Sequence, residues 1–178
     1  MDVTICGQTF AIRSDFRAIL DALAALNDEN MTQWERMIAS LKIFYPDWAK
    51  LPDASEAFRQ AMIFANLGKE QKESFQAKPK LVDWEHDADL IAPSVDKVLG
   101  YSCRRCEYLH WWEFIGAFYS IGDGLFAQVV NIRNKRTKGK KLEKHEQEFA
   151  RENADLIRMD SNRLSQAEID YLKGLGVM

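Results

Sequence analysis

The most aromatic segment of the chain is Tyr108-Leu109-His110-Trp111-Trp112-Glu113-Phe114-Ile115-Gly116-Ala117-Phe118-Tyr119. It is apolar on nearly every side of a helix, which is typical of a helix buried in a protein core. The sequence therefore predicts that residues 108–119 form the central, most buried helix. Adjacent helical residues point about 100° apart, so we expect one of Trp111 and Trp112 in the core and the other at a groove or partner.

Helical patterns precede this segment. Apolar residues at helical spacing predict one helix after a Ser14 cap, a second opened by a capping box at Thr32, and a third after Asp53. The second helix is expected to carry Trp34, Ile38, Leu41 and Tyr45 and to stop at Pro46. A fourth helix is predicted from an Asp83 cap through Ile91, and Pro93 then kinks or restarts it.

The chain begins with a predicted β-hairpin. Val3–Cys6 and Thr9–Ile12 flank Gly7-Gln8, a two-residue turn that starts with glycine. That register pairs Ile5 with Phe10 and Val3 with Ile12 on one apolar face. An isolated hairpin is only marginally stable, so this face must lie against another element.

The C-terminal part of the sequence is more polar. Residues 125–133 predict a short helix, residues 133–144 are strongly basic, and residues 142–159 predict one long polar helix. Leu142, Phe149 and Leu156 recur at heptad spacing along that helix, which suits a partner helix better than a globular core. We therefore treat these three residues as candidate partner-binding positions.

The composition is that of a soluble globular protein. The chain has 178 residues, of which 47% are hydrophobic and 29% charged, with a net charge of −3. We predict a mainly α fold, a compact domain of about six to eight helices with the N-terminal hairpin. Residues 1–135 are expected to form the core domain, and residues 136–178 a basic linker with C-terminal helices, mobile or partner-binding.

The expected location is the cytoplasm. The three cysteines indicate a reducing compartment, no secretion signal is evident, and no apolar run approaches the ~18 residues of a membrane span. No motif of a nucleophile with its base, a phosphate loop or a dinucleotide site is present. We therefore expect a protein that binds other proteins, without catalysis and without a cofactor.

A metal site is the main chemical alternative. Cys103, Cys106 and His110 have the spacing of three zinc ligands, although the sequence offers no clear fourth ligand. Asp83 and Asp87 share one helix face, and an acid–base or metal role is weighed there against simple helix-dipole stabilisation. We also consider that Asp83 or Asp87 accepts a hydrogen bond from an indole or from His110, which would tie the acidic helix to the aromatic one.

Nucleic-acid binding is a further alternative. The basic residues of 133–144 could contact phosphates. No aromatic side chain is interleaved with them, so a solvated loop or a patch for an acidic protein surface is favoured.

Two segments resemble a known family. Asp83-Trp84-Glu85-His86-Asp87-Ala88 and Leu109-His110-Trp111-Trp112-Glu113-Phe114, together with Ser14-Asp15-Phe16-Arg17, are similar to a bacteriophage family labelled by gene-product number fifteen. Its motif positions here are Asp83, Trp84, Asp87, His110, Trp111, Trp112 and Phe114. The family is regarded as related to the tail assembly chaperones of long-tailed phages.

This resemblance implies a function. The partner would be the helical tape-measure protein, with the tail tube protein as a second candidate and self-association expected. Two other possibilities stay open, a small zinc- or nucleic-acid-binding regulator and a structural head–tail connector protein.

Overall fold

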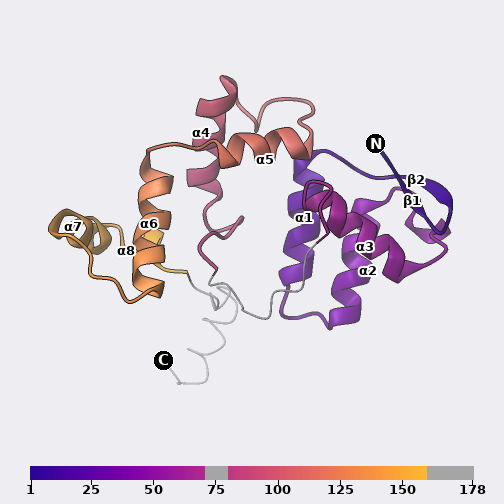
Figure 1. Cartoon of the computed structure of the whole chain (residues 1–178), viewed down its shortest axis with the longest axis horizontal. Helices are drawn as coiled ribbons and strands as arrows, with labels where there is room; N and C mark the ends of the chain where they lie inside the picture. The colour runs from indigo at the N-terminus through magenta and orange to yellow at the C-terminus, as the bar shows by residue number, and fades with distance from the viewer. Residues whose placement is uncertain (71–79, 160–178) are drawn as a thin grey trace, which may run out of the picture. The chain divides into compact units, whose positions relative to one another are not determined.

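A computed structural model describes residues 1–70 and 80–159. Within these ranges the chain forms eight α-helices, one short 3-10 helix and one two-stranded sheet (Figure 1). The predicted mainly α fold with an N-terminal hairpin is confirmed. The chain divides into two compact units, Met1–Gln128 and Val129–Met178. This division lies inside a helix and N-terminal to the expected boundary at residue 135, and residues 160–178 of the expected C-terminal part lie outside the described residues.

The hairpin consists of β1 (Asp2–Ile5) and β2 (Gln8–Ala11), paired with Val3 opposite Phe10. Its turn is Cys6-Gly7, with φ of 47° and 79°, so the predicted Gly7-Gln8 turn is wrong. A turn with two positive φ values places glycine second. The register therefore shifts by two residues, which leaves the apolar face unchanged because side chains alternate with a period of two. Ile5 and Ile12 on that face are buried.

Three helices and the hairpin pack together in the first part of the N-terminal unit. Helix α1 (Phe16–Asn27) packs on α2 (Gln33–Phe44), and α3 (Ala54–Ala65) packs on α2 and β1. The 3-10 helix η1 (Trp48–Lys50) lies between α2 and α3 in the chain. Tyr45, fully buried, donates its hydroxyl to the carbonyl of Ala57 at 2.9 Å. Arg13 donates to the carbonyls of Lys42 and Ile43, so the free C-terminal carbonyls of α2 are satisfied.

The apolar residues predicted for α2 differ in their burial. Leu41 and Tyr45 are buried, whereas Trp34 is 62% exposed. The predicted capping box is present, since Thr32 accepts from the backbone of Glu35 and Glu35 accepts from the backbone of Thr32. The sequence therefore located α2 correctly, and the structure shows that Trp34 lies at its surface.

The N-terminal unit is completed by α4 (Ala88–Leu99), α5 (Trp111–Tyr119) and the first residues of α6 (Leu125–Thr137). The predicted start of a helix at Asp83 is wrong, because residues 84–87 form turns and α4 begins at Ala88. Helix α5 buries one face, formed by Trp111, Phe114, Ile115 and Ala117. Its other face includes Tyr119, which is 72% exposed, so α5 is not buried on nearly every side as the sequence predicted.

The C-terminal unit contains the rest of α6, α7 (Lys144–Glu152) and α8 (Ala154–Ile157). The predicted single helix over residues 142–159 is wrong, because Asn153 separates two shorter helices and Leu142 precedes the first. Asn153 leaves the helical region with φ −116° and ψ 41° and donates its side-chain amide to the carbonyl of Phe149. Asparagine favours such local bonds, which compete with helix continuation.

Candidate partner-binding site

The N-termini of α1 and α5 are joined by backbone hydrogen bonds. Phe16 N–H donates to Leu109 O at 3.0 Å, and Trp111 N–H donates to Ser14 O at 2.7 Å, which forms an isolated bridge between Asp15 and His110. Each bridge residue also caps its own helix. Asp15 accepts from the backbone of Arg17, and His110 Nδ1 accepts from the backbone of Trp112 at 3.1 Å. The family-motif histidine therefore has a structural partner, and Asp15, not Ser14, caps α1.

The adjacent indoles of Trp111 and Trp112 both reach the C-terminus of α3. Trp111 Nε1 donates to the carbonyl of Ala65 at 2.8 Å, and Trp112 Nε1 donates to that of Phe64 at 2.9 Å. The last carbonyls of a helix lack partners within the helix. These two indoles supply such partners from a distant part of the chain and hold α3 and α5 together.

The two rings differ in exposure as expected from their spacing. Trp111 is 2% exposed and Trp112 is 37% exposed. The exposed ring stacks on Phe64 and covers Gly68, where an added Cβ atom would lie 3.7 Å from the indole. Gly68 has a φ of 78°, which glycine adopts at little cost after a helix.

The remaining family-motif aromatics form one cluster around α5. Phe114 stacks on Phe16 of α1 with ring centroids 4.5 Å apart, and it also stacks on Trp111. Trp84 lies against Trp111, Phe114 and Phe118, with the Phe118 centroid at 4.8 Å. Trp84, Trp111 and Phe114 therefore act together as the core that joins α1, α5 and the turns before α4.

Asp83 and Asp87 both accept hydrogen bonds from the backbone, and Asp87 also lies 3.9 Å from Nε2 of His86. Asp83 accepts from the backbone N–H groups of Glu85 and His86 and from Lys80, while Asp87 accepts from the backbone of Asp83 at 3.0 Å. Burial raises the pKa of Asp83, but its hydrogen bonds from Lys80 and His86 outweigh this effect and leave the pKa below its usual value. From the sequence we consider an indole or His110 as a partner of these carboxylates; the indoles of Trp111 and Trp112 donate to α3 instead.

Arg17 binds the loop that contains Cys103 and Cys106. Its guanidinium donates to the carbonyls of Cys103 and Cys106 at 2.9 and 2.8 Å and pairs with Asp15 at 3.1 Å. Arginine suits such a position because its planar fork binds several acceptors at once. The sequence did not single out Arg17, although an Asp two residues before an Arg at a helix start is a visible signal.

The proposed zinc ligands have other partners. The pKa of the Cys103 thiol is raised to about 12, mainly by burial and further by a hydrogen bond with Asp96. Cys106 Sγ donates to the carbonyl of Cys103 at 3.1 Å. His110 accepts from Trp112, as described above. In residues 1–70 and 80–159 no group of three or more His, Cys, Asp or Glu side chains could hold a metal ion. The geometry therefore gives the zinc alternative no support.

Part of the basic segment is also structural. Arg133, 3% exposed, donates to the carbonyls of Leu156 and Ile157 at the end of α8. Lys135 pairs with the buried Glu146 at 2.5 Å, and this hydrogen bond lowers the pKa of Glu146. A cation at a helix C-terminus interacts favourably with the helix dipole. Arg133 and Lys135 therefore bind other residues of the C-terminal unit, and they do not belong to the solvated loop that the sequence favoured.

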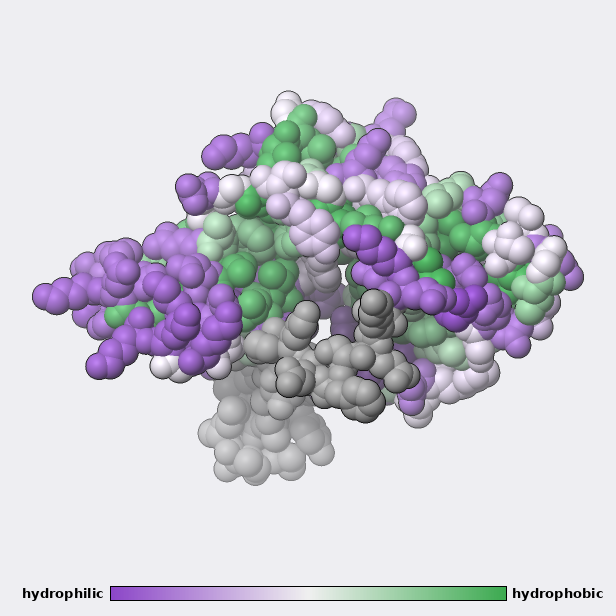
Figure 2. Space-filling view, viewed as in Figure 1, coloured by the Kyte–Doolittle hydropathy of each residue, from purple (hydrophilic) through white to green (hydrophobic). Residues whose placement is uncertain are grey.

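The three heptad positions do not form a continuous seam. Leu142, Phe149 and Leu156 are not fully buried, and the buried residues of this region are Glu146, Ala150 and Ile157. On the face visible in Figure 2, α7 carries mainly hydrophilic side chains. A partner helix would therefore not meet one continuous helix here, because α7 ends between Phe149 and Leu156.

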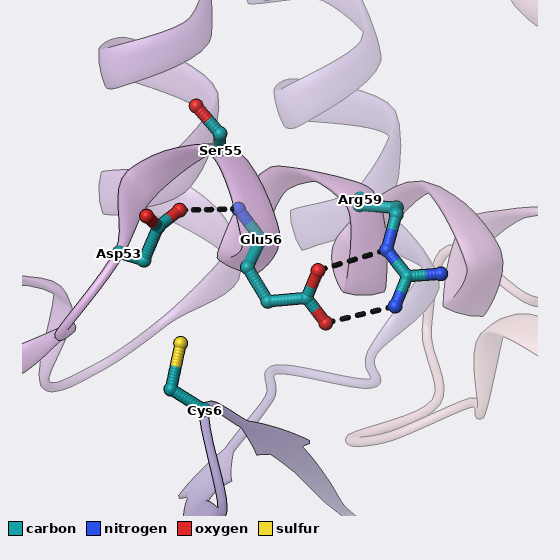
Figure 3. A pocket seen from close by; sticks show the side chains of 5 residues that line it. All are labelled: Cys6, Asp53, Ser55, Glu56 and Arg59. Atoms are coloured by element: carbon teal, nitrogen blue, oxygen red, sulfur yellow. Dashed lines mark hydrogen bonds and ion pairs between the residues drawn. The ribbon is translucent and has the colours of Figure 1, made fainter.

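A polar hollow of about 490 Å³ lies beside the hairpin turn (Figure 3). Asp53 caps α3 by accepting from Glu56 N–H at 2.7 Å, and Glu56 pairs with Arg59 along the same helix. Hydrogen bonds from Arg59 and Gln60 lower the pKa of Glu56 to about 2. The thiol of Cys6 projects toward these residues from the turn. The charged groups of this hollow therefore serve the start of α3.

An apolar groove lies along one face of α4, with a volume of about 420 Å³. We call it the α4 groove; its lining is Pro93, Ser94, Lys97, Val98, Ser120, Ile121, Gly122, Asp123, Gly124 and Leu125. Val98 and Leu125 are large hydrophobic residues that remain exposed. Among the described residues that line the groove there is no histidine or cysteine and only one carboxylate, so they lack the paired reactive groups of general acid–base catalysis. Sequence patterns did not reveal the groove, because it combines one helix face with a glycine-rich connection.

The fold and these surfaces define a helical protein in which the motif residues Trp111 and Phe114 lie in the core and an exposed groove follows α4. None of the helices in the described part of the chain combines the length and the apolar character that a membrane crossing requires. The family model described as Bacteriophage Gp15 protein matches residues 1–157. The chain belongs to this family, as the resemblance indicated, and is therefore a phage protein. Searches of curated proteins and of solved structures give no match.

Proposed function

We propose that this chain is a non-enzymatic tail assembly chaperone that binds the helical tape-measure protein in the bacterial host cytoplasm. The observation that carries the proposal is the α4 groove in a member of a phage protein family. Shallow apolar grooves commonly accept the apolar face of an amphipathic helix. A tape-measure protein exposes such helices until tail tube protein encloses it.

The lining of the α4 groove fits such a helix. Val98 and Leu125 supply exposed apolar area, while Gly122 and Gly124 leave room for close approach of a helix. Lys97 and Asp123 place one charge of each sign at the groove, which is the polar rim expected of a protein-binding site. Several such weak contacts along one long client would retain it, and tube subunits could still displace the chaperone.

Co-expression with the tape-measure protein of the same phage tests the proposal. Tagged wild-type protein should keep the tape-measure protein soluble and co-purify with it. The double variant Val98→Asp and Leu125→Asp should lower the amount retained at least about tenfold, because it places carboxylates in the apolar contact. Both positions are exposed, and an acidic residue at the start of α6 favours the helix.

The matched control is Ser55→Asp, which adds a carboxylate at an exposed helical position away from the α4 groove. Circular dichroism of all variants checks that the fold is retained. The proposal is wrong if wild-type protein does not retain the tape-measure protein, or if the double variant retains as much as the control. Stoichiometric presence of this chain in finished virions would instead favour a structural connector.

A further inference from the structure

Helix α2 carries apolar residues on two faces, and in the described part of the N-terminal unit only one of them is fully buried. Its inward face buries Ser40, Leu41 and Phe44. Its second face lines a shallow hollow of about 410 Å³ with Met31, Trp34, Glu35, Ile38, Ala39 and Lys42. We call this second face the α2 seam.

The α2 seam has the spacing of a helix–helix contact. Its members follow one another by three or four residues or stand next to each other, which places them in one line along the helix. Trp34 is the most exposed of the tryptophans at 62%. Trp48 extends the surface, with the Lys42 ammonium 4.8 Å from its ring centroid. An exposed tryptophan is typical of an energetic centre in a protein interface.

The charges of the seam indicate which helix covers it. Glu35 lies near the N-terminus of α2 and Lys42 near its C-terminus, with Ile38 and the small Ala39 between them. If two copies of α2 run antiparallel about a twofold axis between Ile38 and Ala39, Glu35 of each copy lies opposite Lys42 of the other. A twofold interface must be complementary to itself in this way. Ala39 at the centre allows close approach of the two helices.

We propose that the α2 seam is a homodimer interface, in which two copies of this chain pair through antiparallel α2 helices. Trp34 of each copy covers the C-terminal half of the other copy's α2, and two Glu35–Lys42 pairs fix the orientation. Such a dimer depends on the seam alone, and neither the α4 groove nor the identity of a client affects it.

Sedimentation equilibrium of the purified full chain tests the proposal. Wild-type protein should sediment as a dimer, and Trp34→Ala should raise the dimer dissociation constant at least about 30-fold, because a central tryptophan is lost from both copies. Tyr119→Ala is the matched control, since it removes a more exposed aromatic ring outside the seam, and it should leave the dimer unchanged.

A charge-swap experiment tests the antiparallel arrangement. K42E gives each copy two acidic residues in the seam, and E35K gives each copy two basic ones, so each variant alone should be monomeric. An equimolar mixture should form a heterodimer, because both opposed pairs are then of opposite sign. Recovery in the mixture also shows that E35K, which loses the capping box of α2, still folds.

Three outcomes overturn the proposal. The first is that wild-type protein sediments as a monomer at a loading of about 100 μM. The second is that Trp34→Ala remains as dimeric as Tyr119→Ala, and the third is that the charge-reversed variants stay monomeric when mixed. If the protein is a monomer and its α2 seam binds a helical client peptide instead, the proposal of a homodimer is also wrong.

Discussion

The two adjacent indoles allow a graded test of the junction between α3 and α5. Trp→Phe substitutions keep an aromatic ring but remove the indole N–H. At Trp111, which is 2% exposed, this leaves the carbonyl of Ala65 without its donor. At Trp112, which is 37% exposed, water can reach the site and replace part of the lost bond to Phe64. Trp34 is the reference position, because its ring is 62% exposed and water can solvate whatever the smaller ring leaves uncovered.

The expected losses follow from these environments. An unpaired buried carbonyl costs about 1–3 kcal/mol, and the smaller ring gives up roughly 1 kcal/mol of apolar burial. Trp111→Phe should therefore lower the free energy of unfolding by about 2–4 kcal/mol. Trp112→Phe should cost about 1–2 kcal/mol because its ring is partly hydrated, and Trp34→Phe less than about 0.5 kcal/mol.

Urea unfolding followed by tryptophan fluorescence measures this series. All five tryptophans lie within residues 1–128, so the signal reports only the N-terminal unit. Each variant keeps four of them and is measured at several protein concentrations, because Trp34 also lies in the proposed dimer interface and a concentration-dependent midpoint would reveal a contribution from association. Equal stability of Trp111→Phe and Trp34→Phe would refute the idea that indole donation to α3 stabilises the fold. The reverse order of Trp111 and Trp112 would refute the part assigned to burial.

Three further predictions concern other parts of the structure. Arg17→Lys should lower the free energy of unfolding by about 1–3 kcal/mol, because an ammonium group cannot bind both cysteine carbonyls and Asp15 together; a urea midpoint unchanged from wild type would contradict this. Since burial raises the pKa of Cys103 to about 12, iodoacetamide at a mildly alkaline pH of about 8 should modify the exposed Cys6 well before Cys103, and peptide mass spectrometry showing equal rates in native protein would disprove it. Hydrogen bonds from Arg59 and Gln60 lower the pKa of Glu56 to about 2, so the ionised carboxylate stabilises the fold above the unfolded pKa of about 4.5, and this stabilisation is lost as the pH falls toward 2. Glu56→Gln should therefore reduce the change of the melting temperature with pH over this interval, and an unchanged pH dependence would count against the assignment.

Local sequence signals predicted the elements that depend on neighbouring residues. The capping box at Thr32 and the apolar face of the hairpin are determined by residues a few positions apart, and both are found as expected. The heptad spacing of Leu142, Phe149 and Leu156 was misleading, because periodicity does not register the local bond by which Asn153 interrupts the helix. Where an element was placed correctly, the neighbouring residues alone specified it.

The candidate site is built from contacts between residues that lie far apart in the sequence, which local patterns do not reveal. Carboxylates were the natural acceptors to propose for Trp111 and Trp112, yet the acceptors are main-chain carbonyls at the end of α3, which carry no side-chain signature. The α4 groove and the α2 seam arise from which residues the fold leaves uncovered. The periodicity of α2 identified its apolar residues, but only the folded structure shows that Trp34 is exposed and that Ile38 is only partly buried.

The link between α3 and the paired indoles has a consequence for synthesis of the protein. The acceptor carbonyls precede their donors by 46 and 48 residues. At about 5–20 residues per second, the ribosome delivers the donors roughly 2–10 s after it has completed α3. During that interval the carbonyl of Ala65 has no indole donor, whereas the carbonyl of Phe64 can already accept from the backbone of Leu67. The junction between α3 and α5 can therefore close only after both tryptophans have been added to the chain.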